Sequence, residues 1–420
     1  MAIPKDWERA RLSDIAEVNP KRVLKQGTVA PFIEMSNVNE DLPHPRRIAS
    51  KQFDGGGAKF RNGDTLLARI TPCAENGKTA LVSGLGSEEI GFGSTEFIVL
   101  GERFEVSIPA YIYYLVKWAE VRSQLIQRMT GTSGRQRIPA SALDEVVLGI
   151  PPLPEQKKIA AVLLSVDAAI EKTEAVIAQL QVVKKAMMEQ LLTKGLPGRH
   201  TRFKQTELGE IPEEWEVETI RNLALHVTSG SRGWAEYYSA EGDAFIRSQN
   251  IRDGFFDLSD LAYVSQPESA EGIRTRVQPG DILITITGNN VGNAAVVPNT
   301  WTAPSYVSQH VGLVRLKDNL HADFTGLFLS PSGPGGSQLS AAQYGQSKPG
   351  LNLQSLRNLL VPIPTNQERA SIVSVLRQFQ SQIDLESVTL TALKSVKSSL
   401  SSSLLSGELR VPTDSVPCPV

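Results

Sequence analysis

Residues 149–163 read GIPPLPEQKKIAAVL, and residues 362–376 read PIPTNQERASIVSVL. In both stretches a proline-containing turn leads to an acidic residue and then to apolar residues four apart. Equivalent positions lie 213 residues apart: Glu155 and Glu368, Ile159 and Ile372, Leu163 and Leu376. Proline is tolerated at a helix start, because the first amides have no intrahelical partner and its φ is already helical. The pattern therefore predicts two helices that begin in the same way.

Both predicted helices carry the apolar stripe of a coiled coil. In alternating steps of four and three from Ile159 and from Ile372, eight of ten positions in each helix are apolar,. A helix of about 37 residues extends roughly 55 Å, which makes each one a rigid spacer. Two polar seam residues, Lys184 and Lys397, either fix the register or extend their amines to solvent at the seam edge. The residues expected at the helix interface are Ile159, Leu163, Ile170, Leu180, Lys184, Ile372, Leu376, Ile383, Leu393 and Lys397.

The rest of the chain is also repeated. The opening IPKDW at 3–7 returns as IPEEW at 211–215, and GDTLLARIT at 63–71 returns as GDILITITG at 280–288. The offset changes from 208 to 217 between these motifs and then stays at 213 from Ile138 onward. Surface loops accept insertions, whereas a helix held by its side-chain register does not. The sequence therefore predicts a globular domain of variable length followed by a helix of fixed length, twice.

Within each globular part, short apolar runs bounded by turn residues predict strands, and longer amphipathic runs predict helices. We therefore assign the fold to the α+β class. Two tandem domains are joined by two long helices, which we expect to form an antiparallel coiled coil with pseudo-twofold symmetry. The expected boundaries are 1–153 for the first domain, 154–195 for the central helix, 196–364 for the second domain, 365–410 for the C-terminal helix and 411–420 for a tail.

Composition excludes several classes of protein. The 420 residues are 41% hydrophobic and 21% charged, as in ordinary folded proteins with more than one domain,. The first residues lack the apolar core of a signal peptide, and no uncharged apolar run reaches the ~18 residues of a membrane helix. We therefore expect a cytoplasmic protein without membrane contact. Two cysteines, Cys73 and Cys418, are too few for a disulfide framework or a structural zinc site,.

Motifs for catalysis are also missing from the sequence. Gly77-Lys78-Thr79 resembles the end of a phosphate-binding loop, but Pro72 stands where the first glycine is required,. No HExxH or G-x-S-x-G sequence occurs, and the five histidines are scattered,. A lone histidine such as His310 is more often packed or solvated than catalytic. We therefore expect no catalytic site and no cofactor or metal in this chain.

Charge is distributed unevenly around a net value of −2. Residues 1–153 contain 19 basic and 18 acidic side chains, whereas residues 206–364 contain 10 and 17. The second domain is therefore too acidic for general electrostatic attraction to DNA. Contact with nucleic acid would have to rely on local charge.

Two local stretches have a composition that suits such contact. MTGTSGRQRI at 129–138 and QYGQSKPGLN at 343–352 contain glycine, hydroxyl and amide side chains and no acidic residue. Small residues let the backbone approach a duplex, while Arg, Gln and Ser donate to phosphates and base edges. The alternative is a pair of connectors with incidental charge. A third loop, TGNNVGNAA at 287–295, is either a turn between strands or a source of amides for adenine edges or phosphates,.

The residues assigned to DNA contact come mainly from these loops. They are Arg128, Thr132, Ser133, Arg135, Gln136 and Arg137, then Tyr344, Gln346, Ser347 and Lys348, then Asn289, Asn290 and Asn293, together with Lys78 and Arg69.

The order of these motifs, present twice, resembles the specificity (S) subunits of type I restriction-modification systems. The resemblance covers nearly the whole chain. It rests on the IPKDW and IPEEW openings, the two glycine-containing loops, the two proline-led helix starts, and LLTKGL and LLSGEL at the helix ends. It implies two target-recognition domains, each reading one half of a bipartite double-stranded DNA target, with the helices setting the spacer.

The resemblance also implies partners. Such a subunit is non-catalytic and recruits two adenine-N6 methyltransferase (M) subunits and ATP-dependent endonuclease (R) subunits, which would bring S-adenosylmethionine, ATP and Mg. The chain agrees in lacking the Asn/Asp-Pro-Pro-aromatic motif of these methyltransferases. The alternative, suggested by the acidic second domain, is a coiled-coil scaffold protein that no longer reads DNA.

Overall fold

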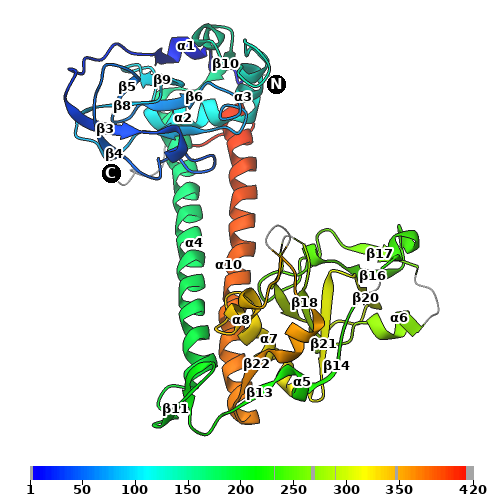
Figure 1. Ribbon diagram of the computed structural model, residues 1–420. Coiled ribbons are helices and arrows are strands. Elements are labelled where there is room, and N and C mark those ends of the chain that lie inside the picture. Colours follow the sequence, from blue (N-terminus) through cyan, green and yellow to red (C-terminus); the bar gives the residue numbers. More distant parts are fainter. Residues whose placement is uncertain (1–2, 231, 266–269, 289, 346–348, 413–420) are drawn as a thin grey trace. The chain divides into compact units, whose positions relative to one another are not determined.

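The computed structural model describes residues 3–230, 232–265, 270–288, 290–345 and 349–412 (Figure 1). The chain forms two compact units, one of residues 1–176 and 386–420 and the other of residues 177–385. We call them unit 1 and unit 2. Each unit contains one globular domain, the first part of the long helix that follows it, and the last part of the other long helix.

Unit 1 is built on two four-stranded sheets. The first sheet is antiparallel throughout and has the order β2 (Ala16–Val18), β9 (Phe97–Glu102), β6 (Thr65–Ala68) and β7 (Thr79–Leu81). In the second sheet β3 and β8 are parallel, and the order is β4 (Ala49–Gln52), β3 (Val29–Ile33), β8 (Ile90–Gly93) and β5 (Ala58–Arg61). A separate ribbon pairs β1 (Glu8–Arg11) with β10 (Val147–Ile150), which joins the two ends of the domain.

Unit 2 repeats this design. Its antiparallel sheet has the order β14 (Ala224–Ser229), β21 (Val311–Leu316), β18 (Ile282–Thr285) and β19 (Ala294–Val296). Its second sheet, in which β16 and β20 are parallel, has the order β15 (Tyr238–Ser239), β17 (Ala262–Val264), β16 (Asp243–Ile246) and β20 (Ser305–Val307). Two ribbons pair β13 (Glu216–Thr219) with β22 (Leu360–Ile363) and β11 (Phe203–Thr206) with β12 (Gly209–Pro212). The repeats differ most at the outer strands of the second sheet.

Helices complete both units. The short ones are α1 (Leu12–Ile15), α2 (Pro109–Lys117) and α3 (Ala119–Gln127) in unit 1, and α5 (Ile220–Leu223), α6 (Ala270–Thr275), α7 (Ala322–Leu329), α8 (Gly336–Ala341) and α9 (Leu353–Asn358) in unit 2. The long ones are α4 (Leu153–Lys194) and α10 (Asn366–Ser406). The predicted α+β class with two long helices is confirmed, and no helix in the described residues is long and apolar enough to span a membrane.

In each unit the helix pair belongs to the core of the domain. The shared core residues include Trp7, Ile159, Leu163, Leu404 and Leu405 in unit 1, and Trp215, Ile372, Leu376, Leu191 and Leu192 in unit 2. Burying one such side chain contributes about 1.5–3 kcal/mol relative to leaving it exposed. Each domain is therefore packed onto the helices of its unit and does not hang from a flexible tether.

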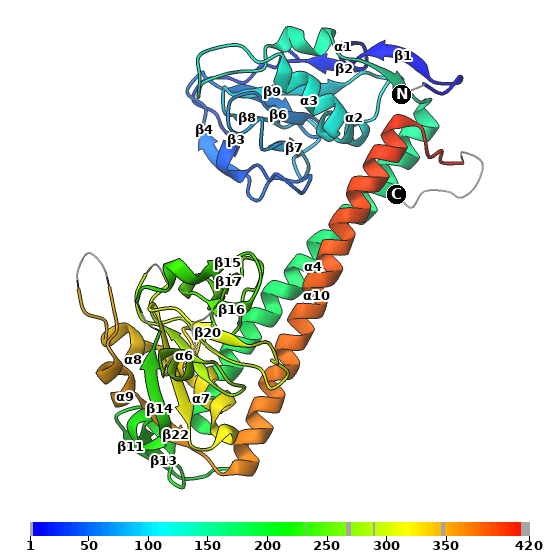
Figure 2. The ribbon, with the colours of Figure 1, turned by 90° about the vertical axis from the view of Figure 1, so that its right-hand side faces the viewer.

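The helix segments within a unit run antiparallel and lie side by side in both views (Figures 1 and 2). In unit 1 the Lys397 amine contacts the Asp167 carboxylate at 2.5 Å, and Lys394 contacts Glu174 at 2.9 Å. From the first contact to the second, the residue number increases along α4 and decreases along α10, as it does in an antiparallel pair. Of the predicted interface residues, six are buried, namely Ile159, Leu163, Ile170, Ile372, Leu376 and Ile383, and four are half-buried, namely Leu180, Lys184, Leu393 and Lys397.

Lys184 and Lys397 occupy the same position in the helix seam of the two units, but they contact different kinds of acceptor. In unit 2 the Lys184 amine donates to Gln380 Oε1 at 2.6 Å. The 213-residue offset relates Lys184 to Lys397 and Asp167 to Gln380, so both contacts are versions of one pair. The pair is ionic in unit 1, where Asp167 also accepts from Tyr114 Oη at 2.5 Å, and has a neutral acceptor in unit 2.

A buried carboxylate holds each helix start. Glu155, which is 2% exposed, accepts from the Trp7 indole at 3.1 Å and from Arg410 Nε at 2.7 Å. Glu368, which is 1% exposed, accepts from the Trp215 indole at 3.1 Å and contacts His200 Nε2 at 2.8 Å. The tryptophans come from the IPKDW and IPEEW motifs, and Arg410 and His200 each follow the end of the other long helix. Each glutamate therefore links the start of one long helix to the tryptophan motif of its domain and to the segment that follows the other long helix.

Candidate nucleic-acid interface

Loop L1, residues 130–137, is a closed turn that follows α3. The backbones of Thr130 and Arg137 exchange two hydrogen bonds, at 3.0 and 2.8 Å. Gly131 has a φ of +124°, and a Cβ there would lie 2.9 Å from the Arg135 carbonyl oxygen, so this turn requires glycine,. Three side chains of L1 are exposed, namely Thr132, Ser133 and Arg135, and Gln136 is half-buried.

L1 is fixed to the strand ends of the first sheet. The Ile138 amide donates to the Arg69 carbonyl at 2.8 Å, and the Arg69 amide donates to the Glu96 carbonyl at 3.0 Å. The Arg137 guanidinium binds both Glu96 carboxylate oxygens at 2.8 to 3.1 Å. Arg137, with a smaller contribution from Arg69, lowers the pKa of Glu96. Arg137 therefore holds L1 in place through Glu96.

Unit 2 contains the same backbone frame around loop L2, residues 344–350. Tyr344 and Gly350 exchange hydrogen bonds at 2.9 and 3.0 Å. The Leu351 amide donates to the Ile286 carbonyl at 2.8 Å, and the Ile286 amide donates to the His310 carbonyl at 2.9 Å. The two repeats thus place a closed turn against equivalent strand ends.

The side chains that close the two frames differ. His310 occupies in unit 2 the place of Glu96 in unit 1, and its Nδ1 lies 2.5 Å from Thr287 Oγ1. Gln309 Nε2 lies 3.2 Å from the other ring nitrogen of His310. A hydroxyl–imidazole–amide chain therefore replaces the ion pair of unit 1.

Other residues assigned to DNA contact have partners within the chain. Arg128 forms an ion pair with Glu145 at 2.9 Å, and Lys78 Nζ lies 3.4 Å from the Met35 carbonyl oxygen. Asn293 Nδ2 donates to the Ile251 carbonyl at 3.0 Å. These contacts leave the DNA assignments as predictions.

The remaining assigned residues lie in or beside L2 and the Asn-rich loop. The Asn290 carbonyl accepts from the Asn293 amide at 3.0 Å, which closes that turn, and the Tyr344 side chain is 55% exposed. The assigned residues Asn289, Gln346, Ser347 and Lys348 lie outside the described residues.

Sequence reasoning missed Glu96 and His310. Glu96 lies 41 residues before Arg137, and only the strand pairing of the first sheet brings the two together. Lys21 and Lys59, which line a pocket with Arg69, were missed for the same reason. One signal was available, because Glu96 and His310 each stand directly before an apolar strand sequence, FIVL or VGLVRL.

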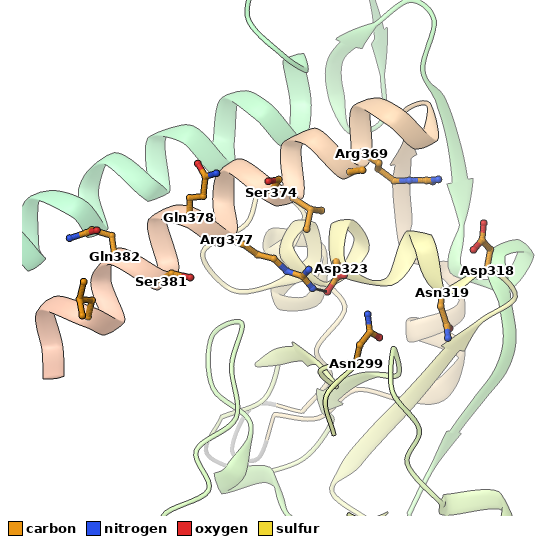
Figure 3. A pocket seen from close by; sticks show the side chains of 13 residues that line it. Asn299, Asp318, Asn319, Asp323, Arg369, Ser374, Arg377, Gln378, Ser381 and Gln382 are labelled. Atoms are coloured by element: carbon orange, nitrogen blue, oxygen red, sulfur yellow. Dashed lines mark ion pairs between the residues drawn. The ribbon is translucent and has the colours of Figure 1, made fainter. Parts of the chain in front are cut away.

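A pocket of about 790 Å³ in unit 2 lies between α10 and the segments around α7 (Figure 3). Arg377 points to Asp323, with 2.6 Å between their charged groups, and Asn299 lies nearby. Arg369 contacts His321 Nε2 at 2.9 Å, and burial lowers the pKa of both side chains. None of the described residues of L2 lines this pocket, so we do not assign it to the interface. Across the described ranges, no group of three or more His, Cys, Asp or Glu is placed to hold a metal ion.

Known proteins match this chain over nearly its whole length. The family model described as type I restriction modification DNA specificity domain matches residues 4–182 and 212–395. The chain is 23% identical to the type I restriction enzyme MjaVIII specificity subunit of Methanocaldococcus jannaschii, over 98% of this chain and 95% of that protein.

Solved structures share the fold. A chain from a study of complex assembly and conformational transition of the type I R-M system aligns with a TM-score of 0.60 at 16% identity, covering 97% of this chain and 100% of that one. The type I restriction-modification S subunit from M. genitalium aligns with a TM-score of 0.56 at 13% identity, covering 96% and 98%. Two matches to the family model, one on each repeat, show that the chain belongs to the type I restriction-modification DNA specificity domain family.

Proposed function

We propose that this chain is the DNA specificity subunit of a type I restriction-modification complex. Each unit would contact one half of a bipartite target in double-stranded DNA. One observation supports this most directly: L1 and L2 differ in sequence but are held at equivalent strand ends by the same backbone hydrogen bonds. A constant frame that carries a different loop in each unit suits the recognition of two different half-sites.

The exposed groups of the loops fit the chemistry of DNA. The hydroxyls of Thr132 and Ser133 suit phosphate oxygens, which position a protein on the duplex. Arg135 and Gln136 suit guanine and adenine edges, and one good bidentate pair discriminates against a wrong base by about 1–3 kcal/mol. In L2 the exposed Tyr344 ring offers an apolar and hydroxyl-bearing surface.

The chemistry of the complex would belong to its partners. In this proposal the chain is non-catalytic and recruits two adenine-N6 methyltransferase (M) subunits and the endonuclease (R) subunits. S-adenosylmethionine, ATP and Mg would be bound by those subunits. Membership of the specificity family supports this part of the proposal.

Mapping of methylated adenines tests the proposal. DNA from cells that express this chain with its methyltransferase partner is expected to carry a two-part motif with an unread spacer. Replacing residues 131–136 with a glycine-serine loop of equal length is expected to alter or abolish one half of the motif. A continuous motif in the wild type, or a loop replacement that leaves both halves unchanged, would contradict the proposal.

A second candidate is a scaffold that binds the methyltransferase subunits without reading DNA. The observation in its favour is the excess of acidic side chains in residues 206–364, which contain 17 against 10 basic ones. DNA affinity measured over a range of salt concentrations separates the two candidates. A DNA reader loses affinity steeply as salt rises, because phosphate contacts release counterions. A scaffold would show no specific DNA affinity at any salt concentration.

A further inference from the structure

A pocket of about 420 Å³ in unit 1 is lined in part by Arg69, whose backbone belongs to the frame that holds loop L1. It is formed by the segment after β2, the start of β5, the end of β6 and the start of β9. None of its lining residues is acidic, and four are cations: Lys21, Arg22, Lys59 and Arg69. We call this pocket the cationic groove.

Within the part of the chain that the structure describes, three of the four cations form no ion pair. Arg22 forms an ion pair with Asp64, with 2.5 Å between Nη2 and Oδ1, and both side chains are nearly buried. Lys21, Lys59 and Arg69 form no ion pair among the residues that the structure describes. Like charges held together repel one another, so the groove is poised for an anion.

The surroundings of Lys59 and Arg69 do not neutralise them. The Lys59 amine lies 5.2 Å from the centre of the Phe53 ring, a contact that leaves its charge intact. Arg69 Nε is buried without a hydrogen-bond partner. The carboxylate that acts on Arg69 is Glu96, which is already bound at both oxygens by Arg137.

The groove is continuous with the frame of L1. Arg69 precedes Ile70, which forms a bridge with Arg137, and the Arg69 carbonyl accepts the Ile138 amide. Thr95 lines the groove and precedes Glu96. An extended polyanion that touches the exposed side of L1 is therefore within reach of the groove.

Unit 2 has lost most of this charge at the equivalent positions. Strand pairing relates Lys59 to Arg276, and backbone hydrogen bonds relate Arg69 to Ile286. Lys21 and Gly230 each stand three residues after an equivalent paired residue, Val18 in unit 1 and Val227 in unit 2. A Cβ on Gly230 would lie 2.1 Å from the Val307 carbonyl oxygen, so a lysine does not fit there. Of the three groove cations that form no ion pair in unit 1, only Lys59 therefore has a cationic equivalent in unit 2, which is Arg276.

We propose that the cationic groove binds backbone phosphates of the DNA beside the half-site contacted by L1. Unit 1 then supplies most of the sequence-independent affinity, and unit 2 contributes base contacts with little phosphate attraction. This inference rests on the proposed function and names a phosphate subsite for it. It also explains how a chain with an acidic second domain holds DNA, because half to two-thirds of protein–DNA hydrogen bonds go to phosphate and sugar.

The salt dependence of DNA binding tests the inference. The full chain, assembled with methyltransferase subunits, is titrated with a duplex of arbitrary sequence at several KCl concentrations. The Lys21→Ala/Lys59→Ala variant is expected to lose affinity and to lower the slope of log K against log salt by about 2, since each phosphate contact contributes about 0.9. The matched control is Lys5→Ala/Arg9→Ala, which removes two exposed cations of unit 1 outside the groove and is expected to keep the wild-type slope.

Further variants separate phosphate binding from other roles. Arg69→Ala is expected to lower the slope by about 1, and Arg69→Lys to recover most of it. Arg276→Ala in unit 2 is expected to change the slope less than either substitution of a groove lysine alone. The methylated motif is expected to stay the same in every groove variant, because phosphates carry no base identity.

Two results would overturn the inference. One is an equal slope for the groove variant and its matched control. The other is a changed base within the methylated motif of a groove variant, which would make the groove a base reader. Failure of the proposed function looks different, because the wild-type complex would then methylate no bipartite motif.

Discussion

Glu155 is the residue on which the closure of unit 1 depends, since it accepts from both Trp7 and Arg410. Replacing Glu155 with alanine leaves the buried Trp7 indole without its acceptor and leaves Arg410 with Asp6 alone. We expect the free energy of unfolding of unit 1 to fall by about 2–3 kcal/mol, a value reduced because Arg410 is partly exposed. Urea denaturation of the full chain measures the change.

The control for this substitution uses the second carboxylate that binds Arg410. Asp6 is exposed, so Asp6→Asn removes an ion pair that water screens and is expected to change stability little,. Equal losses for Glu155→Ala and Asp6→Asn would mean that burial of Glu155 does not matter.

Lys117 makes the stability of unit 1 depend on pH. Burial, with Lys397 and Arg122 nearby, lowers the pKa of Lys117 from 10.5 to about 8. Between these values the unfolded chain binds more protons at this site than the native chain, so stability rises with pH across that window. We expect the wild type to gain stability relative to Lys117→Met between pH 7 and pH 9.5. Parallel urea denaturations at both pH values check this, and a constant difference would contradict it.

At the scale of the element, the repeated seam pair offers a matched comparison. Lys397→Met leaves the buried Asp167 with Tyr114 as its remaining partner, whereas Lys184→Met leaves only the neutral Gln380. We expect losses of about 3 kcal/mol for the first substitution and about 1 kcal/mol for the second. Thermal unfolding of the two variants measures the difference. Adding Asp167→Asn to Lys397→Met is expected to recover part of the loss, which a purely steric effect of the introduced methionine would not allow.

Loop L1 should respond to the pair that fixes it. Reversing one charge with Arg137→Glu places two carboxylates together and releases the loop, so we expect specific DNA affinity to fall several-fold. The double variant Glu96→Arg/Arg137→Glu restores an ion pair of opposite sense and is expected to recover part of the affinity. DNA titration compares the wild type, the single variant and the double variant. If both lose the same affinity, Arg137 contacts DNA directly and does not act through Glu96.

The local sequence pattern was sufficient to predict the long helices, but it was insufficient to predict the contacts that form the candidate site. Ile159 and Ile372 with their apolar stripes predicted two long helices, because helical spacing is a property of neighbouring residues,. The frame of L1 could not be predicted in that way. Glu96, Arg69 and Arg137 meet only through strand pairing, and their spacing in sequence carries no signal of it. The acid-free composition located L1 but could not show that Arg137 is engaged within the chain.

At the scale of the whole molecule, the helices would act as a ruler. Removing one heptad from each helix keeps the seam in register and shortens a helix by about 10 Å. This distance corresponds to roughly three base pairs of duplex, at about 3.4 Å each. We expect the spacer in the methylated motif to shorten by about three base pairs while both half-sites stay the same. Adenine mapping in cells gives the answer, and an unchanged spacer would rule out the ruler.

The core of unit 1 contains both Trp7 and Leu405, which lie far apart in the order of synthesis. At a synthesis rate of about 5–20 residues per second, roughly 20–80 s separate the appearance of these two residues on the ribosome. During that time the first domain has emerged but lacks the helix segment that covers part of its apolar surface. The nascent chain therefore exposes an apolar surface until α10 has been synthesised. A truncated chain that ends before α10 keeps this surface exposed. The core of the first domain can therefore be completed only after the second long helix has been synthesised.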